Sequence, residues 1–135
     1  MKLLLKLEEL AQLLACLYVL NTCHAPWWCY GLLLIGPDIG MLGYLVSTRV
    51  GAVTYNLFHH KGLALLVGVA GCALAWTMVR SGMKEFGYVG SVIASAILYG
   101  HSCLDRMLGY GLKFGDHFQH THLGWIGKAR STGEQ

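Results

Sequence analysis

The chain has 135 residues, enough for one domain, and 55% of them are hydrophobic while only 13% are charged. An ordinary soluble domain has about 25% charged residues, so this balance indicates a membrane protein. The net charge of +3 and the absence of a Lys/Arg-rich run exclude a nucleic-acid partner on compositional grounds, and the sequence contains neither a Walker loop nor zinc-ribbon spacing.

Apolar residues fall into four blocks, at 3–23, 30–46, 63–79 and 86–104, each close to the length of about 20 residues that a membrane-spanning helix needs. The third block contains no charge and can be extended back towards Val50. Backbone groups in hydrocarbon must satisfy their own hydrogen bonds, which favours helices. The sequence therefore predicts an all-α, polytopic membrane protein, with four transmembrane helices in a bundle at 1–127 and a short polar tail at 128–135. A soluble helical bundle is the alternative, but its helices would show a polar face, which the third block lacks.

The first block begins with MKLLLKLEELAQLLAC, whose early lysines resemble those of a signal peptide. Glu8, Glu9 and Gln12 interrupt the stretch where an apolar core is required, so we expect no cleavage. Cys23 and Cys29 bracket the first turn, and they would pair only if that turn faced an oxidising compartment.

Orientation follows from the basic residues. With four spans, both termini and the middle turn share one side, and the positive-inside rule places the more basic side in the cytoplasm. We therefore expect both termini to be cytoplasmic. The basic residues on that side are Lys2, Lys6, Arg49, Arg106, Lys113, Lys128 and Arg130, whereas those on the other side are Arg80 and Lys84.

Folding each predicted hairpin about its turn places the ionisable groups of all four helices in the cytoplasmic half. Asp38 and His59 lie at nearly equal distances before and after Arg49, so they fall at similar depth. The third hairpin brings His59 level with Asp105 and Arg106. The first hairpin brings Glu8 and Glu9 of the first helix near Tyr44 of the second.

Small residues form two stripes suited to close helix packing. Such stripes pack helices within one chain or between copies, so a homo-oligomer is one expectation. A proline lies inside the first stripe and is expected to kink its helix. The stripes are Gly36 with Gly40 around Pro37, and Gly87 with Ser91 and Ser95.

Ionisable groups within a membrane are expensive and are therefore candidates for function. Asp38 lies in an apolar run, where its alternative role is an ion pair with Arg49 or Arg106 that locks the bundle. His101 and Asp105 share one helix face because they are four residues apart. This pair has three interpretations: a structural hydrogen bond, a general base oriented by a carboxylate, or two metal ligands one turn apart.

A mixture of imidazole and carboxylate groups suits a divalent zinc, iron or manganese ion. No Glu-x-x-His motif of the kind found in metal-binding bundles is present, so the prediction rests on the constellation. Glu9 is an alternative to Glu8. The predicted metal ligands are Glu8, Asp38, His59, His101, Asp105 and His122, and the predicted catalytic residues are Asp38, His59, His101 and Asp105.

Four motifs, PDIGMLGYL, GAVTYNLFH, HSCLDRMLGYGLKF and FQHTHLGWIG, resemble a family of small bacterial integral membrane proteins that is described only as a domain of unknown function. The resemblance covers about residues 3–127 and implies a four-helix protein of the bacterial inner membrane, but it transfers no activity. It does not mark His60, His117 or His120. The positions that it marks are Glu8, Pro37, Asp38, Tyr44, Tyr55, Asn56, His59, His101, Asp105, Arg106, Tyr110, Lys113, Thr121 and His122.

The favoured function is a metal-dependent membrane enzyme acting on a lipid or other apolar substrate, in which the ion acidifies a water or activates oxygen. A second hypothesis is a carrier of protons or small ions, which the lack of ionisable residues in the outer half disfavours. A third is a structural or partner-binding membrane protein, and a fourth is a haem protein in which His59 and His101 hold the iron. The predicted substrate-binding residues are Tyr44, Tyr55, Asn56, Arg106, Tyr110 and Lys113.

Overall fold

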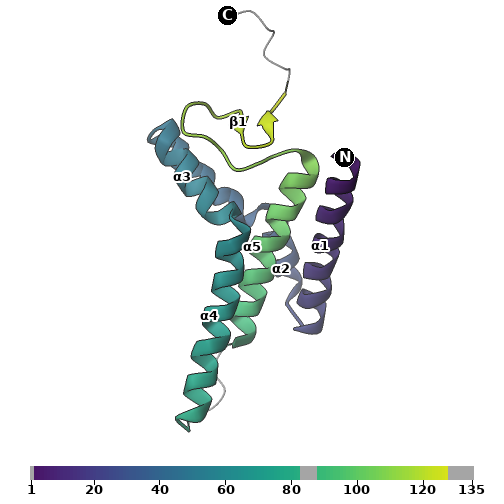
Figure 1. Cartoon of the computed structure of the whole chain (residues 1–135). Helices are drawn as coiled ribbons and strands as arrows, with labels where there is room; N and C mark the ends of the chain where they lie inside the picture. The colour runs from purple at the N-terminus through teal and green to yellow at the C-terminus, as the bar shows by residue number, and fades with distance from the viewer. Residues whose placement is uncertain (1, 83–87, 128–135) are drawn as a thin grey trace, which may run out of the picture.

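The structure, a computed structural model, describes residues 2–82 and 88–127 and is mainly helical (Figure 1). The predicted all-α class is confirmed. The predicted tail at 128–135 lies outside the described residues, as do Lys84 and Gly87. The elements in chain order are α1 (Lys2–Thr22), α2 (Trp27–Ile35), the 3-10 helix η1 (Gly36–Leu45), α3 (Thr48–His59), α4 (Lys61–Arg80), α5 (Tyr88–Leu108), β1 (His120–Thr121) and β2 (Gly124–Trp125).

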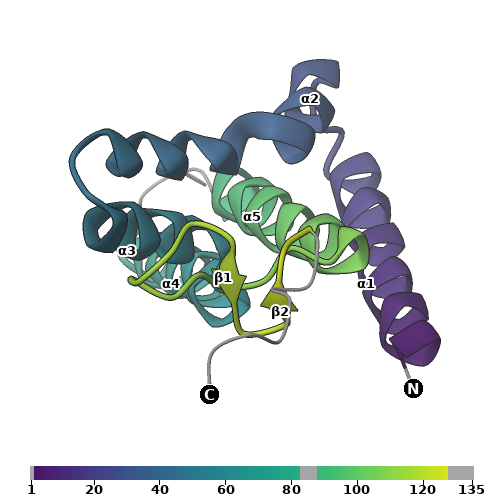
Figure 2. The ribbon, with the colours of Figure 1, turned by 90° about the horizontal axis from the view of Figure 1, so that it is seen from above.

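Two helical segments are long and apolar enough to cross a membrane: the continuous α2–η1 stretch Trp27–Leu45, and α4. The other two predicted spans correspond to α1 and α5, which lie side by side (Figures 1 and 2). Each of these helices has charges near the end where α1 begins and α5 finishes, such as Glu9 and Arg106. A crossing by α1 and α5 stays a prediction.

The second predicted span is helical throughout, but it changes from an α-helix to a 3-10 helix at Gly36. Pro37 has no backbone N–H and its ring disturbs the preceding α-helical turn, so the expected kink takes the form of a tighter helix. Gly40 then packs closely on α3, since a Cβ there would lie 2.8 Å from the Thr54 carbonyl oxygen. The Thr54 hydroxyl donates to the Gly40 carbonyl at 2.6 Å.

The third apolar block, together with its extension back towards Val50, forms two helices rather than one. α3 ends at His59, and His60 has an extended backbone with φ −86° and ψ 110°. The His60 Nδ1 atom accepts from the Leu63 amide at 3.2 Å and caps α4. Figure 2 shows the result: α3 is a separate helix that lies beside the 3-10 segment.

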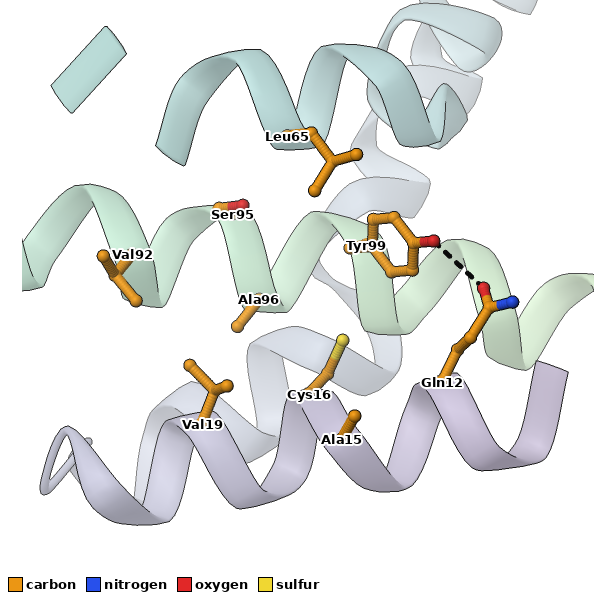
Figure 3. Close-up of a pocket in the computed structure, with 9 residues that line it drawn as sticks. All are labelled: Gln12, Ala15, Cys16, Val19, Leu65, Val92, Ser95, Ala96 and Tyr99. Carbon is orange, nitrogen blue, oxygen red and sulfur yellow. Dashed lines mark hydrogen bonds between the residues drawn. The ribbon is translucent and has the colours of Figure 1, made fainter. Parts of the chain in front are cut away.

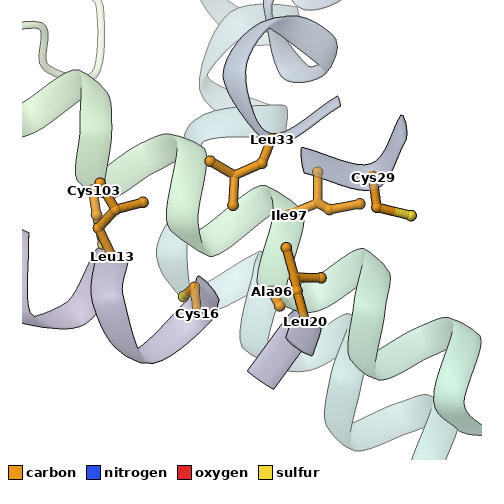
Figure 4. Close-up of a cluster of buried hydrophobic side chains, with 8 residues drawn as sticks. All are labelled: Leu13, Cys16, Leu20, Cys29, Leu33, Ala96, Ile97 and Cys103. Carbon is orange, nitrogen blue, oxygen red and sulfur yellow. The ribbon is translucent and has the colours of Figure 1, made fainter. Parts of the chain in front are cut away.

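Helices α1, α2 and α5 meet around an apolar core (Figure 4). Gly100 permits this approach, because a Cβ on it would lie 2.8 Å from Leu33 Cδ1 and 3.1 Å from Cys16 Cβ. All cysteines are free, so Cys23 and Cys29 do not pair. The core residues are Leu13, Cys16, Leu20, Cys29, Leu33, Ala96, Ile97 and Cys103.

Helices α4 and α5 pack through small side chains. A Cβ on Gly68 would lie 2.9 Å from Ser95 Oγ, and Gly71 faces Ser91 even more closely. Ser91 and Ser95 belong to a predicted small-residue stripe. The described part of this stripe therefore packs within the chain, which accounts for it without a second copy.

We expect the substitution Gly100→Val to lower the free energy of unfolding by about 1–3 kcal/mol, because the added side chain would force α1 and α2 away from α5. Thermal unfolding of the detergent-purified protein, followed by circular dichroism, measures this. Gly90→Val is the matched control: Gly90 lies in the same helix, and a Cβ there would meet nothing within 4 Å. Equal unfolding midpoints for the two variants would contradict the packing role of Gly100.

Candidate metal centre

Four of the predicted site residues converge where η1, α3 and α5 meet. Asp38 comes from η1, His59 from the last turn of α3, and His101 and Asp105 from α5. One potential ligand atom from each lies within 4.8 Å of those of the other three. The two imidazoles are buried, with 2% and 1% of each residue exposed. The structure therefore brings residues from three separate helices to a single point.

Hydrogen bonds on the far side of each ring fix which imidazole nitrogen carries a proton. His59 Nδ1 lies 2.8 Å from the Tyr55 carbonyl oxygen, and His101 Nδ1 lies 2.8 Å from the Leu33 carbonyl oxygen. A carbonyl oxygen only accepts, so both Nδ1 atoms must be donors. In the neutral rings, both Nε2 atoms are consequently unprotonated and present lone pairs.

These two Nε2 atoms face one another at 3.0 Å, which two bare lone pairs would resist. The Asp38 Oδ1 atom lies 3.6 Å from His59 Nε2 and 3.5 Å from His101 Nε2. The Asp105 carboxylate lies 3.3 Å from His59 Nε2 and 3.8 Å from His101 Nε2. Four acceptors thus point at a common centre, and a cation is the group that satisfies all of them. Histidine ligands of metals commonly donate their second N–H to a backbone carbonyl, as both do here.

Neighbouring side chains hold the cluster in place. The Tyr55 hydroxyl donates to Asp105 Oδ2, and the Tyr55 ring stacks on His59 with centroids 3.7 Å apart and an interplanar angle of 14°. The Ser102 hydroxyl donates to the His59 carbonyl oxygen at 3.0 Å. The positions of His59 and Asp105 are therefore set by two different helices at once.

Asp38 does not adopt the alternative role of an ion pair with arginine. Among the described residues, its ion-pair distances are to His59 and His101. Arg106 instead lies 3.8 Å from the carboxylate of Glu9 on α1. The Asp38 side chain, which is 38% exposed, is the most open member of the cluster.

The first helix contributes nothing to the cluster. Glu8 is exposed and accepts from Gln12 at 3.2 Å, while Glu9 accepts from the Lys61 ammonium at 2.5 Å. Tyr44 packs edge-on against Phe118 with ring centroids 5.0 Å apart. The expectation that the acidic pair lies near Tyr44 is not met, because the 3-10 segment leaves the bundle rather than running back along α1.

The segment after α5 closes one end of the cluster. The Asn56 amide donates to the Lys113 carbonyl at 2.8 Å and accepts from the Lys113 amide at 2.7 Å, as a neighbouring strand would. The Lys113 ammonium is buried, donates to the Phe118 carbonyl at 3.0 Å and lies 4.9 Å from the centre of the Tyr55 ring. Burial lowers the pKa of Lys113, and the negative charges of Asp105 and Asp38 act in the opposite direction.

The remaining predicted residues surround the cluster without joining it. His122 is exposed, and its Nδ1 atom accepts from the Leu112 amide at 2.8 Å. Arg106 and Tyr110 line a crevice beside His59 and Asp105 that is too narrow for a water molecule. The Tyr44 hydroxyl is buried and, within residues 2–82 and 88–127, has no hydrogen-bond partner. An unpaired buried hydroxyl is a place where a ligand or water can bind.

Sequence reasoning missed two supports of the site. Leu33 acts through its backbone carbonyl, so its side chain gives no indication of the role. Ser102 follows His101 directly but resembles the many small residues of α5. A polar network formed by Lys61 with Glu9 and Gln12 was also not foreseen, because Lys61 lies at the start of an apolar block.

The chain belongs to a protein family. The model of the family described as "Domain of unknown function (DUF4260)" matches residues 2–126, which is nearly the whole chain. Comparison with curated proteins and with solved structures gave no match. All four cluster residues lie within the matched range.

We expect Asn56→Ala to loosen the segment that closes the cluster. The substitution leaves the Lys113 amide and carbonyl without their partners, which costs about 1–3 kcal/mol. Hydrogen exchange at the Lys113 amide should accelerate by at least about five-fold, since each 1.4 kcal/mol is a factor of ten. Asn21→Ala, on the exposed side of α1, is the matched control and should leave that amide unchanged. Unaltered protection in Asn56→Ala would show that other contacts hold the segment.

Proposed function

We propose that the protein is a metal-dependent membrane enzyme whose divalent ion, zinc, iron or manganese, is held by Asp38, His59, His101 and Asp105. One observation carries the proposal: two imidazoles with their Nδ1 protons committed to carbonyls direct both Nε2 atoms and two carboxylates at one centre. The donor set of two nitrogens and two carboxylates suits these metals, and no thiolate takes part. Cys103 supports this choice, because its sulfur lies 3.6 Å from Gln12 Oε1 on another side of α5.

A divalent ion at this centre would supply Lewis acidity, towards either a substrate oxygen or a bound water. The protein groups around it have separate tasks. Tyr55 orients the Asp105 carboxylate through the hydrogen bond that its hydroxyl donates. Tyr44 offers an uncommitted hydroxyl to a polar group of the substrate. Arg106 and Tyr110 line the narrow crevice beside His59 and Asp105, where they would contact a polar group of the substrate.

The proposed substrate is a lipid or another apolar molecule with a polar group. In this proposal α1, α2–η1, α4 and α5 cross the bacterial inner membrane, and both termini are cytoplasmic. The apolar character of α2–η1 and α4 supports the membrane location. The position of the cluster near the start of α4 and the end of α5 supports a site that is reached from the cytoplasmic leaflet.

A second candidate function is proton transfer without a metal. It is favoured by the distance of 3.0 Å between the two Nε2 atoms, because a single shared proton would also relieve their repulsion. The two candidate functions predict different amounts of bound metal per chain, in the wild type and in a variant with a carboxylate replaced by an amide. Both amounts can be measured directly.

We expect His101→Ala and Asp105→Asn each to lower bound metal per chain by at least about ten-fold, given that loss of even an outer partner of a ligand commonly costs ten-fold or more. Arg106→Gln should retain the metal, because a guanidinium is not a ligand. Elemental analysis of protein purified under metal-replete conditions, with insertion checked by membrane fractionation, measures this. His117→Ala is a matched control for loss of an imidazole outside the cluster. Wild-type protein without stoichiometric metal would rule out the metal centre and leave the shared proton.

The topology is tested by reporter fusions. A reporter that is active only in the cytoplasm should be active when fused after residue 135 and inactive when inserted after Gly82, at the end of α4. The expected asymmetry arises from the basic residues on the side of the termini. Activity at both positions would remove the crossing by α5, which lies between them, and activity at Gly82 alone would invert the orientation.

A further inference from the structure

A groove lies over α5, between α1 and α4, on a different face of α5 from the metal centre (Figure 3). Its volume is about 400 Å³, which falls in the usual range of 300–1,000 Å³ for small-molecule sites. Figures 1 and 2 show α1 and α4 on either side of α5, and all three helices contribute to the lining. The lining residues are Gln12, Ala15, Cys16, Val19, Leu65, Val92, Ser95, Ala96 and Tyr99.

The groove offers almost nothing to a polar ligand. Gln12 and Tyr99 lie together at one end (Figure 3), and the Tyr99 hydroxyl is occupied in donating to Gln12 Oε1 at 3.0 Å. The same Gln12 oxygen also accepts from Lys61 at 2.6 Å. The Gln12 amide nitrogen donates to Glu8. The lining beyond this end is mostly aliphatic, so ordered water would lack the polar partners it needs. The occupant must therefore be apolar along most of its length.

The polar end and the apolar end of the groove lie at different depths along the proposed membrane-spanning helices. Lys61 is the first residue of α4; it bridges to Glu9 of α1 and donates to Gln12, which marks the polar end of the groove. Arg106 lies seven residues after Tyr99 on α5, about 10 Å further towards the same end. Val92 lies seven residues before Tyr99, about 10 Å deeper. The groove thus runs from a charged layer into the region that the proposed membrane location assigns to hydrocarbon.

The charged layer contains both signs. Glu9 lies 2.5 Å from the Lys61 ammonium and 3.8 Å from the Arg106 guanidinium, and Glu8 is bonded to the neighbouring Gln12. Two carboxylates and two cations suit a headgroup that itself carries both charges better than they suit a purely anionic one. A zwitterionic phospholipid has this headgroup and a slender apolar chain attached to it.

We propose that the groove binds one acyl chain of a zwitterionic phospholipid of the cytoplasmic leaflet, with the headgroup beside Lys61 and Arg106. This inference rests on the membrane location in the proposed function, but not on the metal. It assigns a lipid site to the face of α5 that carries Tyr99 and Val92, separate from the face that carries His101 and Asp105.

The test uses photolabelling. The protein is reconstituted in phosphatidylcholine vesicles that contain a trace of phosphatidylcholine with a diazirine on one acyl chain, and adducts are located by mass spectrometry. Adducts at Val92 and Ala96 should exceed those at Val69 and Leu74, which are exposed on α4 outside the groove. Excess unlabelled phosphatidylcholine should suppress the groove adducts first.

Two matched pairs of variants block the groove or spare it. Ala15→Trp and Leu65→Trp place an indole in the groove from α1 and from α4, and each should reduce the groove adducts about ten-fold, equivalent to about 1.4 kcal/mol. Ala11→Trp and Leu66→Trp place the same indole on exposed positions outside it and should leave the adducts unchanged. Both helices thus provide a test, so poor folding of one variant does not decide the result.

The outcomes separate this inference from the proposed function. Groove adducts that persist in Ala15→Trp and Leu65→Trp, or adducts spread evenly over α4, would overturn the lipid site even if the samples retain metal. Absence of adducts at Leu74 as well would overturn the membrane location and the lipid site together. Suppression of the groove adducts by oleic acid alone, and not by phosphatidylcholine, would replace the phospholipid by a free fatty acid and overturn the proposal as stated.

Discussion

The approach of two imidazole nitrogens to 3.0 Å is the constraint on which the arrangement of the helices depends. Each ring is anchored from behind by a carbonyl, one in its own helix and one in α2, so neither can turn its protonated nitrogen inward. Two carboxylates at the same point add negative charge to a region already rich in lone pairs. Such a centre is unstable without a positive partner, whether an ion or a shared proton. The helices that meet there are held together against this repulsion by the apolar core and the closing segment.

The close packing beside the cluster has a direct effect on its geometry. Gly100 lets Leu33 approach α5, and the next residue, His101, bonds to the Leu33 carbonyl. Gly100 therefore allows the close contact between α2 and α5, and the next residue, His101, has its imidazole positioned by that contact. Two residues of α3 also have separate roles. Asn56 hydrogen-bonds to the backbone of Lys113 in the segment after α5, and His59 is a member of the cluster.

Much of the site was predictable because it depends on depth along helices, which residue counting measures well. Equal spacing about a turn placed Asp38 and His59 together, and a spacing of four residues placed His101 and Asp105 on one face. The failures arise where the backbone departs from a straight α-helix. The 3-10 winding after Gly36 and the break at His60 depend on local geometry that hydropathy does not record, and they take Tyr44 away from α1. The sequence also did not indicate which of several possible partners a side chain would bind. Glu8, a predicted metal ligand, instead accepts a hydrogen bond from Gln12 of its own helix.

The distribution of the cluster along the chain has a consequence for biosynthesis. Asp38 and His59 are made well before α5, and 42 residues separate the two histidines. During synthesis from the N-terminus, η1 and α3 therefore emerge before the two cluster residues of α5, His101 and Asp105, exist. The centre is therefore complete only after the last helix, α5, has been made. A chain that stops before His101 would keep the pair of Asp38 and His59, but it would lack the other two members of the cluster.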